Sequence, residues 1–324
     1  MCNQSWKLIA GLALIAGCGT SAAQKYPNKP IRLVVCFPTG SPSDLLGRLL
    51  GQRLGDTLGQ SFVIDNKPGA GGVVGADVVA KAAPDGYTLL MCGIGPLAIS
   101  PGLIANIPFE PLRDFAPVTL VASVPYLLVV SPSLPADSVK ALVALAKETP
   151  GRLNYASAGI GSAGQLASEL FKNLTKTDML HVAYRGVAPA LSDLSAGQVH
   201  MMIAGITAFL PHIKSGRLKP LGVASTSRSP LLPNVPTIIE AGVPGFTASG
   251  WTGLEAPRRT PADIVVRLNR EVLSILKVQE VRDSMLVMGA EPIGNQPAEF
   301  AAYMRDELAK WTRVIRALGI KEEI

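Results

Sequence analysis

The feature that most constrains the fold is a unit found in both halves of the chain: a short apolar run, then a glycine-rich turn, then an amphipathic helix. In the first half, residues 31–36 (IRLVVC) have the mainly apolar, β-branched character of a strand buried on both faces. A turn rich in Gly, Pro and Ser follows at 37–44. The leucines within 45–54 then recur every three or four residues, on one face of a helix. Alternating strands and helices of this kind predict a parallel sheet with right-handed crossovers.

The same unit returns in the second half, with a predicted strand at 153–156, a glycine-rich turn at 157–164 and a helix at 165–174. The other predicted elements are strands at 62–64, 87–92, 179–184 and 199–204, and helices at 76–83 and 188–194. Residues 118–130 form two apolar, strand-like stretches broken by Pro125, and 218–225 is another strand-like run. Two amphipathic C-terminal helices are predicted within 264–276 and 300–315. The repetition is one of architecture, because the residues of the two units do not align well.

We therefore predict an α/β fold of two lobes, each a doubly wound, mainly parallel sheet flanked by helices. Two extended crossings are expected to form a hinge around a cleft between the lobes. The chain should cross to the second lobe near residue 125 and return near residue 223. Lobe 1 then comprises residues 24–124 and 224–324, and lobe 2 comprises residues 125–223.

The first 23 residues are predicted to be an export signal and not part of the fold. Lys7 precedes a run of about 10 small and apolar residues, which is too short to span a bilayer and typical of the core of a secretory signal. Two processing sites stay open. Cleavage after Ala23 would release a soluble protein, whereas cleavage before Cys18 would leave an acylated cysteine as a membrane anchor. The sequence has no later uninterrupted apolar run long enough to span a bilayer, so the mature chain is not expected to cross a membrane.

Composition and motifs argue against several classes of function. The net charge of +6 is spread thinly, without the dense Lys/Arg run of a nucleic-acid-binding protein. There is no P-loop motif, and Val74 stands where a dinucleotide-binding G-x-G-x-x-G motif has its third glycine. The histidines occur outside any H-E-x-x-H spacing and no C-x-x-C occurs, so we predict structural histidines, no metal site and no cofactor. No catalytic residue is predicted: Ser157 and Ser162 have no base at motif spacing, although a base close in space stays open.

The two glycine-rich turns form the predicted ligand site. Ligands of open α/β sheets bind beyond the carboxyl ends of the strands, where a helix N-terminus offers unpaired N–H groups and a partial positive charge. Such a site suits a carboxylate or a phosphate. We expect Ser41 to be the N-cap of the first helix, with Pro42 at its first position and Asp44 completing a capping box, and Ser162 to be the N-cap in the second turn. The alternative is that both turns are ordinary caps with packing glycines.

Cys36 and Cys92 end the first and third predicted strands, which are neighbours in a doubly wound sheet. In an oxidising compartment they can form a disulfide if their Cα atoms lie about 4.4–6.8 Å apart. Two reduced, buried cysteines are the favoured alternative, because a cross-strand bridge strains a parallel ladder.

Short motifs follow one another in order from residue 26 to residue 242, and the resemblance that they carry extends to about Lys321. They are YPNKPIRLVV at 26–35, FPTGSPSD at 37–44, NKPGAGG at 66–72, APDGYTL at 83–89, DFAPV at 114–118, LNYASAGIGS at 153–162, YRG at 184–186, LPHI at 210–213, PNVPT at 233–237 and EAG at 240–242. Together they resemble the tripartite tricarboxylate transporter receptors, also known as the Bug family of periplasmic solute-binding proteins. The resemblance implies a Venus-flytrap, type II-like binding-protein fold. It also implies a monomeric periplasmic receptor that hands a small organic carboxylate to membrane permease subunits.

In such receptors, the turn after the first strand and the turn after the first strand of the second lobe clamp one carboxylate, largely through backbone amides and water. Carried over by position, these turns are residues 37–44 and 157–165. The residues expected to contact the ligand are Phe37, Pro38, Thr39, Gly40, Ser41, Ser43, Asp44, Ser157, Ala158, Gly159, Gly161, Ser162, Gln165, Tyr184, Ala204 and Gly205.

Departures from the family pattern shape the expected ligand. Pro42 removes one N–H group from the first turn, and Gln165 stands where the family often has a histidine. Ala204 and Gly205 stand where the family often has an aspartate that binds the far end of the ligand. A buried aspartate without a partner costs about 1–3 kcal/mol, so an alanine there favours a ligand without an amine. We expect a monocarboxylate with an apolar or aromatic tail.

Two other functions stay open. The chain could be the ligand-sensing receptor of a membrane sensor kinase. A less favoured alternative is an enzyme on the same two-lobed fold, which would need a converging acid, base or cofactor lysine.

Overall fold

The computed structural model describes residues 26–319, so the predicted export signal and Cys18 lie outside the described residues. Within this range, ten strands form one mixed sheet in the order β2-β1-β3-β9-β4-β7-β5-β6, and β8 and β10 pair with β4 beside this path. The strands are β1 (Ile31–Val35), β2 (Phe62–Asn66), β3 (Thr88–Gly93), β4 (Phe115–Val130), β5 (Asn154–Ser157), β6 (Leu180–Ala183), β7 (Met201–Gly205), β8 (Lys219–Val223), β9 (Ser249–Pro257) and β10 (Glu291–Pro292).

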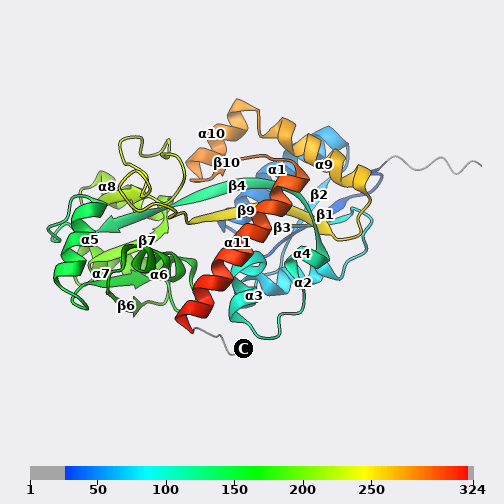
Figure 1. The fold of residues 1–324 in the computed structure, drawn as a ribbon. Helices are drawn as coiled ribbons and strands as arrows, with labels where there is room; N and C mark the ends of the chain where they lie inside the picture. The colour runs from blue at the N-terminus through cyan, green and yellow to red at the C-terminus, as the bar shows by residue number, and fades with distance from the viewer. Residues whose placement is uncertain (1–25, 320–324) are drawn as a thin grey trace, which may run out of the picture.

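One strand joins the two halves of the sheet. The first part of β4 pairs antiparallel with β9 and its second part with β7 and β8, and Figure 1 shows it running through both lobes. The sequence predicts two stretches broken at Pro125, but the structure has one strand of 16 residues. Pro125 is the last residue paired with β9, and Tyr126 is the first paired with β7. The proline therefore lies where the ladder changes partner, and its missing N–H group interrupts neither pairing.

Each lobe contains the predicted parallel group, with β1 between β2 and β3 and β5 between β6 and β7. The sheet as a whole is mixed, because β9 runs antiparallel to both β3 and β4. The sequence does not predict β9, since two glycines and Glu255 lower its strand propensity. One of these glycines is required by packing: a side chain at Gly253 would overlap the ring of Phe300.

Helices cover both faces of the sheet in each lobe. In lobe 1, α1, α9 and α10 share an apolar core on one face, and α2, α3 and α11 cover the other. In lobe 2, α7 and α8 cover one face, and α5 and α6 the other. The helices are α1 (Pro42–Leu58), α2 (Val73–Ala80), α3 (Ser100–Leu103), α4 (Pro111–Asp114), α5 (Val139–Glu148), α6 (Ala163–Thr175), α7 (Val187–Ser195), α8 (Ile206–Lys214), α9 (Ala262–Ile275), α10 (Gln279–Val287) and α11 (Pro297–Leu318), with short helical turns η1 (Ala70–Gly72) and η2 (Gly95–Ile99).

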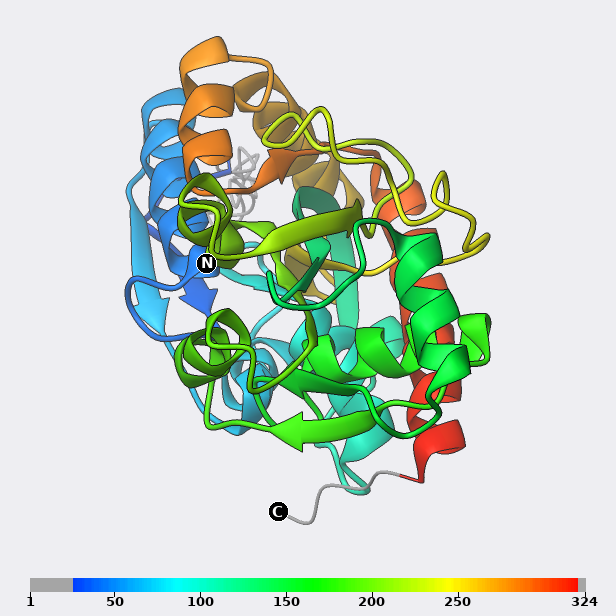
Figure 2. The same ribbon diagram turned by 90° about the vertical axis from the view of Figure 1, so that its left-hand side faces the viewer.

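The C-terminal helix α11 packs against both lobes. It contacts η2, α3 and β4 in lobe 1 and α6 in lobe 2. Figure 1 shows it crossing the molecule in front of the sheet, and Figure 2 shows it along one side. Its buried residues Phe300, Trp311 and Ile315 belong to an apolar cluster that continues to Phe171 and Phe246. The two lobes are thus joined by a shared core as well as by strand β4.

The segment between β8 and β9 stays beside the second part of β4. Ala224 donates its N–H group to the carbonyl of Tyr126, and Ala248 donates to the carbonyl of Ala224. Val223 also forms a parallel bridge with Thr237. The lobe boundaries remain a prediction, and these contacts favour a return to lobe 1 near residue 248 over the predicted return near 223.

Candidate functional site

The strand register places the carboxyl ends of both parallel groups at one gap. Strand β3 runs in the same direction as β4, because β9 lies antiparallel between them, whereas β7 runs against β4. Gly93, the last residue of β3, and Ala122 of β4 both pair with Thr252 of β9, so they lie at the same height in the sheet. The last residue of β7, Gly205, pairs with Tyr126. Four residues of a strand span about 13 Å, so the two groups end facing each other across a short length of β4.

The first glycine-rich turn follows β1 and caps α1. Ser41 is the N-cap, as predicted: its Oγ accepts a hydrogen bond from the N–H group of Asp44 (3.3 Å). The Asp44 carboxylate accepts one in return from the N–H group of Gly40 (2.9 Å). The predicted capping box would have used the N–H group of Ser41, which donates instead to the carbonyl of Pro38. The turn therefore closes one residue earlier than a standard capping box.

The second glycine-rich turn, after β5, repeats this geometry. Ser162 is the N-cap of α6, as predicted, and its Oγ accepts from the N–H group of Gln165 (3.3 Å). The side-chain oxygen Oε1 of Gln165 accepts from the N–H group of Gly161 (2.7 Å). Both turns have the sequence Gly-Ser-x-x-z, where z is Asp44 in the first turn and Gln165 in the second. The side-chain oxygen of z accepts a hydrogen bond from the N–H group of the glycine. The local structure is the same in both lobes, although the sequences share only these positions.

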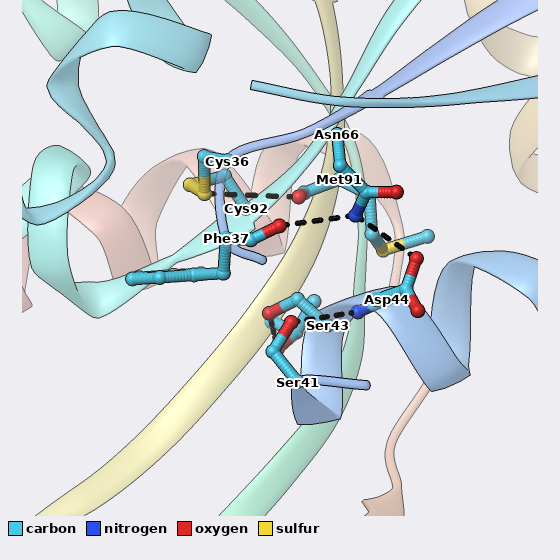
Figure 3. The surroundings of a disulfide bond; sticks show 9 residues. Cys36, Phe37, Ser41, Ser43, Asp44, Asn66, Met91 and Cys92 are labelled. Atoms are coloured by element: carbon cyan, nitrogen blue, oxygen red, sulfur yellow. Dashed lines mark hydrogen bonds between the residues drawn. A yellow bond between two sulfur atoms is a disulfide. The ribbon is translucent and has the colours of Figure 1, made fainter. Parts of the chain in front are cut away.

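The first turn contains a fixed negative charge. The side chain of Asp44 is 1% exposed and accepts hydrogen bonds from Arg48 Nε (3.0 Å) and Asn66 Nδ2 (2.9 Å) as well as from Gly40. Burial alone would raise the pKa of Asp44, but these hydrogen bonds outweigh it and hold the pKa below its usual value. Asn66 Nδ2 also donates to the carbonyl of Phe37 (3.0 Å), as Figure 3 shows, so one amide from β2 fastens both ends of the turn.

The second turn is held by a neutral polar network. His181 of β6 lies beside Tyr155 of β5, with the two rings stacked at 4.9 Å. Its Nε2 atom is 2.7 Å from Ser157 Oγ, and its Nδ1 atom is 3.1 Å from Gln165 Nε2. Burial lowers the pKa of His181, and Lys172 lowers it further, although Glu169 opposes the shift.

The hydrogen bonds define the tautomer of His181. Gln165 Oε1 is engaged with a backbone donor, so the amide nitrogen of Gln165 must donate to Nδ1 of the histidine. The proton of the neutral ring is then on Nε2, which donates to Ser157 Oγ. The Ser157 hydroxyl in turn donates to the carbonyl of Gly159. Ser157 and His181 resemble a nucleophile and base in distance, but this tautomer cannot accept the serine proton.

Several residues predicted to contact a ligand have polar groups engaged within the protein. The N–H groups of Gly40, Gly159 and Gly161 donate to side chains of their own turns. The acceptors are the buried side chains of Asp44 for Gly40, Ser157 for Gly159 and Gln165 for Gly161. These residues shape the turns from within.

The residues predicted to contact a ligand lie at or near the carboxyl ends of the strands, and they differ in how exposed they are. Pro38, Thr39 and Gly40 are exposed, whereas Ser157 is fully buried. The hydroxyl of Tyr184 donates to Asp193 of α7 (2.7 Å), and burial, with that bond, raises the pKa of Tyr184 to about 12. The half-buried members are Phe37, Ser41, Ala158, Gly159, Gly161, Ser162 and Gly205, and the buried ones include Ser43 and Ala204.

The two turns are linked through the segment after β3. A side chain at Gly95 of η2 would lie 3.6 Å from the ring of Phe37, in the first turn. A side chain at Gly161, in the second turn, would meet Leu103 of α3 at 3.1 Å. Since α3 follows η2 directly, both turns pack against one continuous segment of lobe 1. That they enclose one shared cavity remains a prediction.

Sequence reasoning missed His181 and Asn66 as parts of the site. Both lie on outer strands of their parallel groups, and both reach a turn that follows the central strand. The predicted strand order was sufficient to place β2 beside β1, so a polar residue at the end of β2 was the available signal for Asn66. His181 required the register, because only its pairing with Tyr155 brings it near Ser157.

Comparison with known proteins identifies the family. The sequence profile of the tripartite tricarboxylate transporter family receptors matches residues 46–320. The chain belongs to this family. Protein BugT of Bordetella pertussis is 39% identical to the receptor over 320 residues, covering 97% of this chain and 98% of BugT. The predicted resemblance is confirmed.

Solved structures of similar proteins agree with the fold. One from R. palustris, with adipate, is 39% identical with a TM-score of 0.76 and covers 91% of the receptor and 99% of that chain. MatC from Rhodopseudomonas palustris, with bound malate, is 35% identical with a TM-score of 0.72 and covers 90% of the receptor and all of MatC. The predicted two-lobed binding-protein fold is confirmed, with a mixed sheet in place of a mainly parallel one.

Two features are absent from residues 26–319. Over this range, no helix combines the length and the apolar character needed to cross a membrane. In the same part of the chain, His, Cys, Asp and Glu side chains form no group of three or more that could hold a metal ion.

Proposed function

We propose that the receptor captures a small carboxylate between its lobes outside the cytoplasm and delivers it to the membrane permease of a tripartite transporter. The observation that carries this proposal is the repeated Gly-Ser cap on strand ends that face each other across β4. Helix N-termini in this position favour an anion. Family membership and relatives solved with adipate and malate support a carboxylate over a phosphate.

The proposed ligand is a monocarboxylate with an apolar or aromatic tail. At the carboxyl end of β7, Ala204 and Gly205 offer no charged side chain for a second polar group. Beside the second cap, Ile160 is 73% exposed, and Phe37 of the first turn is half-buried, so apolar surface lies next to both caps. Adipate and malate are dicarboxylates, so this receptor would differ from those relatives in what binds the far end of the ligand.

The site supports binding and not catalysis. The hydroxyl of Ser157 is fully buried, and His181 donates to it from Nε2. A histidine that acts as a base must instead accept the proton of the serine. We accordingly propose a monomeric periplasmic receptor without a catalytic residue, either soluble or anchored through Cys18.

Calorimetric titration of the mature protein tests the proposal, after native mass spectrometry for an acid that copurifies. The panel is hexanoate and phenylacetate against adipate, malate, citrate and glutamate. We expect at least one monocarboxylate to bind at least tenfold more tightly than any dicarboxylate. Citrate or glutamate as the tightest ligand would contradict the ligand class, and no binding by any acid would contradict the function.

A single variant sharpens the assignment of the far end of the site. Ala204→Asp restores the acid that the family often has, and it should weaken hexanoate binding while improving glutamate binding relative to the wild type. Ala196→Asp, at the exposed C-terminal cap of α7 and before β7 begins, introduces the same charge away from the carboxyl end of β7 and serves as the control. Equal effects of both variants would show that position 204 does not contact the ligand.

A further inference from the structure

A disulfide lies at the root of the first turn. Cys36 and Cys92 are joined, with their Cα atoms 5.7 Å apart, and both residues are fully buried. Val35 pairs with Met91 in the register of β1 and β3, so the two cysteines are the next pair along the ladder. Sequence reasoning left both redox states open and favoured reduced cysteines; the structure contains the bridge. Its position is notable because Cys36 directly precedes the turn at 37–44, and Cys92 lies just before η2.

The disulfide lies among three segments of lobe 1: the turn at 37–44, the turn after β2 and η2. A side chain at Gly72, in the turn after β2, would lie 3.3 Å from Cys36 Sγ and 3.1 Å from Pro96 of η2. Gly75 approaches the backbone of Cys36 just as closely, since a side chain there would lie 2.9 Å from its Cα. Cys36 Sγ therefore has little room to move toward the turn after β2, and that turn in turn packs against η2.

The turn at 37–44 can move only at its exposed tip. One end of this turn leaves directly from Cys36, and Pro38, Thr39 and Gly40 at its tip are exposed. The turn is otherwise held from β2, where Asn66 donates to Phe37 and Asp44. Figure 3 shows the disulfide and Asn66 on either side of Phe37. A covalent anchor from β3 and two hydrogen bonds from β2 thus fix the turn between them.

We propose that the Cys36–Cys92 disulfide is a positioning element of the carboxylate site, which holds the 37–44 turn in the geometry that binds the ligand. This inference rests on the proposed function. Two thiols cannot lie as close as two bonded sulfur atoms, so reduction displaces Cys36 and, with it, Phe37 and the exposed tip of the turn. If the competent geometry is then only fractionally populated, the apparent dissociation constant rises by the inverse of that fraction.

The test compares the oxidised receptor, the same protein reduced by a trialkylphosphine, and the double variant Cys36→Ser with Cys92→Ser. In the reduction, the phosphine is oxidised to its oxide with oxygen from water, and the two sulfurs take up the two hydrogens. Intact-mass analysis after thiol alkylation counts the free thiols. The tightest acid of the titration panel, for example hexanoate, is the probe in each form.

We expect the reduced form and the double variant to bind at least tenfold more weakly than the oxidised receptor. Backbone amides of the 37–44 turn should also exchange hydrogen faster, while those of the 157–165 turn keep their rate. Leu268→Ala, in the core on the other face of lobe 1, is the matched control for lost stability, and it should leave the dissociation constant unchanged. The phosphine should not alter binding by the double variant.

The outcomes separate the two proposals. If the oxidised and reduced forms bind the probe equally, the positioning role is overturned and the receptor function stands. If the oxidised receptor binds none of the acids, the proposed function is overturned and this inference with it. Should the double variant fail to fold, the reduced wild type provides the same comparison.

Discussion

The two capping turns of the receptor have one geometry and two chemistries. In both, a serine caps the helix and the third helical residue accepts a hydrogen bond from the N–H group of the preceding glycine. In lobe 1 that residue is Asp44, which is charged, buried and paired with Arg48. In lobe 2 it is Gln165, a neutral amide bound to His181. The first turn is further anchored by a disulfide, whereas the second is held by hydrogen bonds and by packing.

The contrast between Asp44 and Gln165 predicts where the negative charge of a ligand would be stabilised best. A carboxylate in the first turn of a helix already interacts with the positive end of its dipole. At α1 this place is taken by Asp44, whereas the first turn of α6 contains no acidic residue. In the proposed site, we therefore expect an incoming carboxylate to be stabilised more strongly at the α6 end. We propose that the first turn is a rigid wall of the site and that the N-terminus of α6 provides the stronger positive field.

Removal of the disulfide should have the largest effect on stability. For a loop closed over a sequence separation of 56 residues, the chain-entropy model gives about 4 kcal/mol. The variant with both Cys36 and Cys92 replaced by serine should lose about this much free energy of unfolding, measured in urea by tryptophan fluorescence. A loss below about 1 kcal/mol would show that the bridge adds little to the hydrogen bonds of the first turn.

Truncation of the third helical residue should cost more in the first turn than in the second. Asp44→Ala leaves donors of Gly40, Asn66 and Arg48 without their acceptor, and charged hydrogen bonds are the stronger kind, so we expect a loss of about 3 kcal/mol. Gln165→Ala removes neutral bonds only, and about 2 kcal/mol should be lost. Chemical unfolding of both variants measures the two losses.

Gln52→Ala is the control for that pair, because Gln52 is exposed on α1 and its loss should change stability by less than about 0.5 kcal/mol. Equal losses for the two turn variants would mean that the charge of Asp44 contributes nothing beyond its shape. The variant Asp44→Asn, which keeps that shape, separates the two contributions.

A charge placed in the second turn should weaken ligand binding without unfolding the protein. Ser162→Asp keeps an acceptor for the N–H group of Gln165 and puts an acid at the N-cap of α6, where acids favour the helix, so stability should stay within about 1 kcal/mol of the wild type. The same charge opposes a ligand carboxylate, and we expect about fivefold to tenfold weaker binding by calorimetry, which corresponds to about 1 kcal/mol. Unchanged affinity would contradict the assignment of the ligand charge to the α6 end.

Sequence predicted the parts of this comparison that depend on local pattern. The N-caps Ser41 and Ser162, the parallel groups and the central place of β1 follow from residue spacing and turn composition. Strand β9 could not be predicted in the same way, because Gly253 is required by its contact with Phe300 and not by strand propensity. The continuity of β4 through Pro125 depends on which partner strand lies on either side.

The parts of the site that escaped prediction are long-range contacts of polar groups. The sequence identifies Gln165 as a candidate ligand contact, but only the fold shows that its side chain is turned inward to His181 and Gly161. The pairing of Asp44 with Asn66 likewise depends on two strands meeting at one edge. Spacing along the chain fixes which residues cap a helix, and it does not fix what those residues bind across the sheet.

The smallest expected effect is a difference in the pH at which the two turns loosen. The pKa of His181 is lowered by burial, with Lys172 adding to the shift, Glu169 opposing it and Tyr155 stacked on the ring. Between this lowered pKa and the usual 6.5, the unfolded chain binds more protons than the folded one, so stability falls as pH drops below about 6.5. The pKa of Asp44 is also lowered, from a usual 3.8, so its contribution persists until the pH falls below about 4.

Hydrogen exchange at pH 7, 5.5 and 3.5 distinguishes these two windows. The amides of Gly159 and Gly161 should lose protection at a higher pH than the amide of Gly40, because a protonated His181 cannot accept the hydrogen bond of Gln165, whereas Asp44 keeps accepting from Gly40 until it is protonated itself. His181→Asn should flatten the dependence of unfolding free energy on pH between 7 and 5, with a remaining slope from His200, whose pKa burial also lowers. If the amides of both turns lose protection at the same pH, Gln165 and Asp44 do not respond separately to pH. The two turns would then differ only in the strength of the hydrogen bonds that these residues accept.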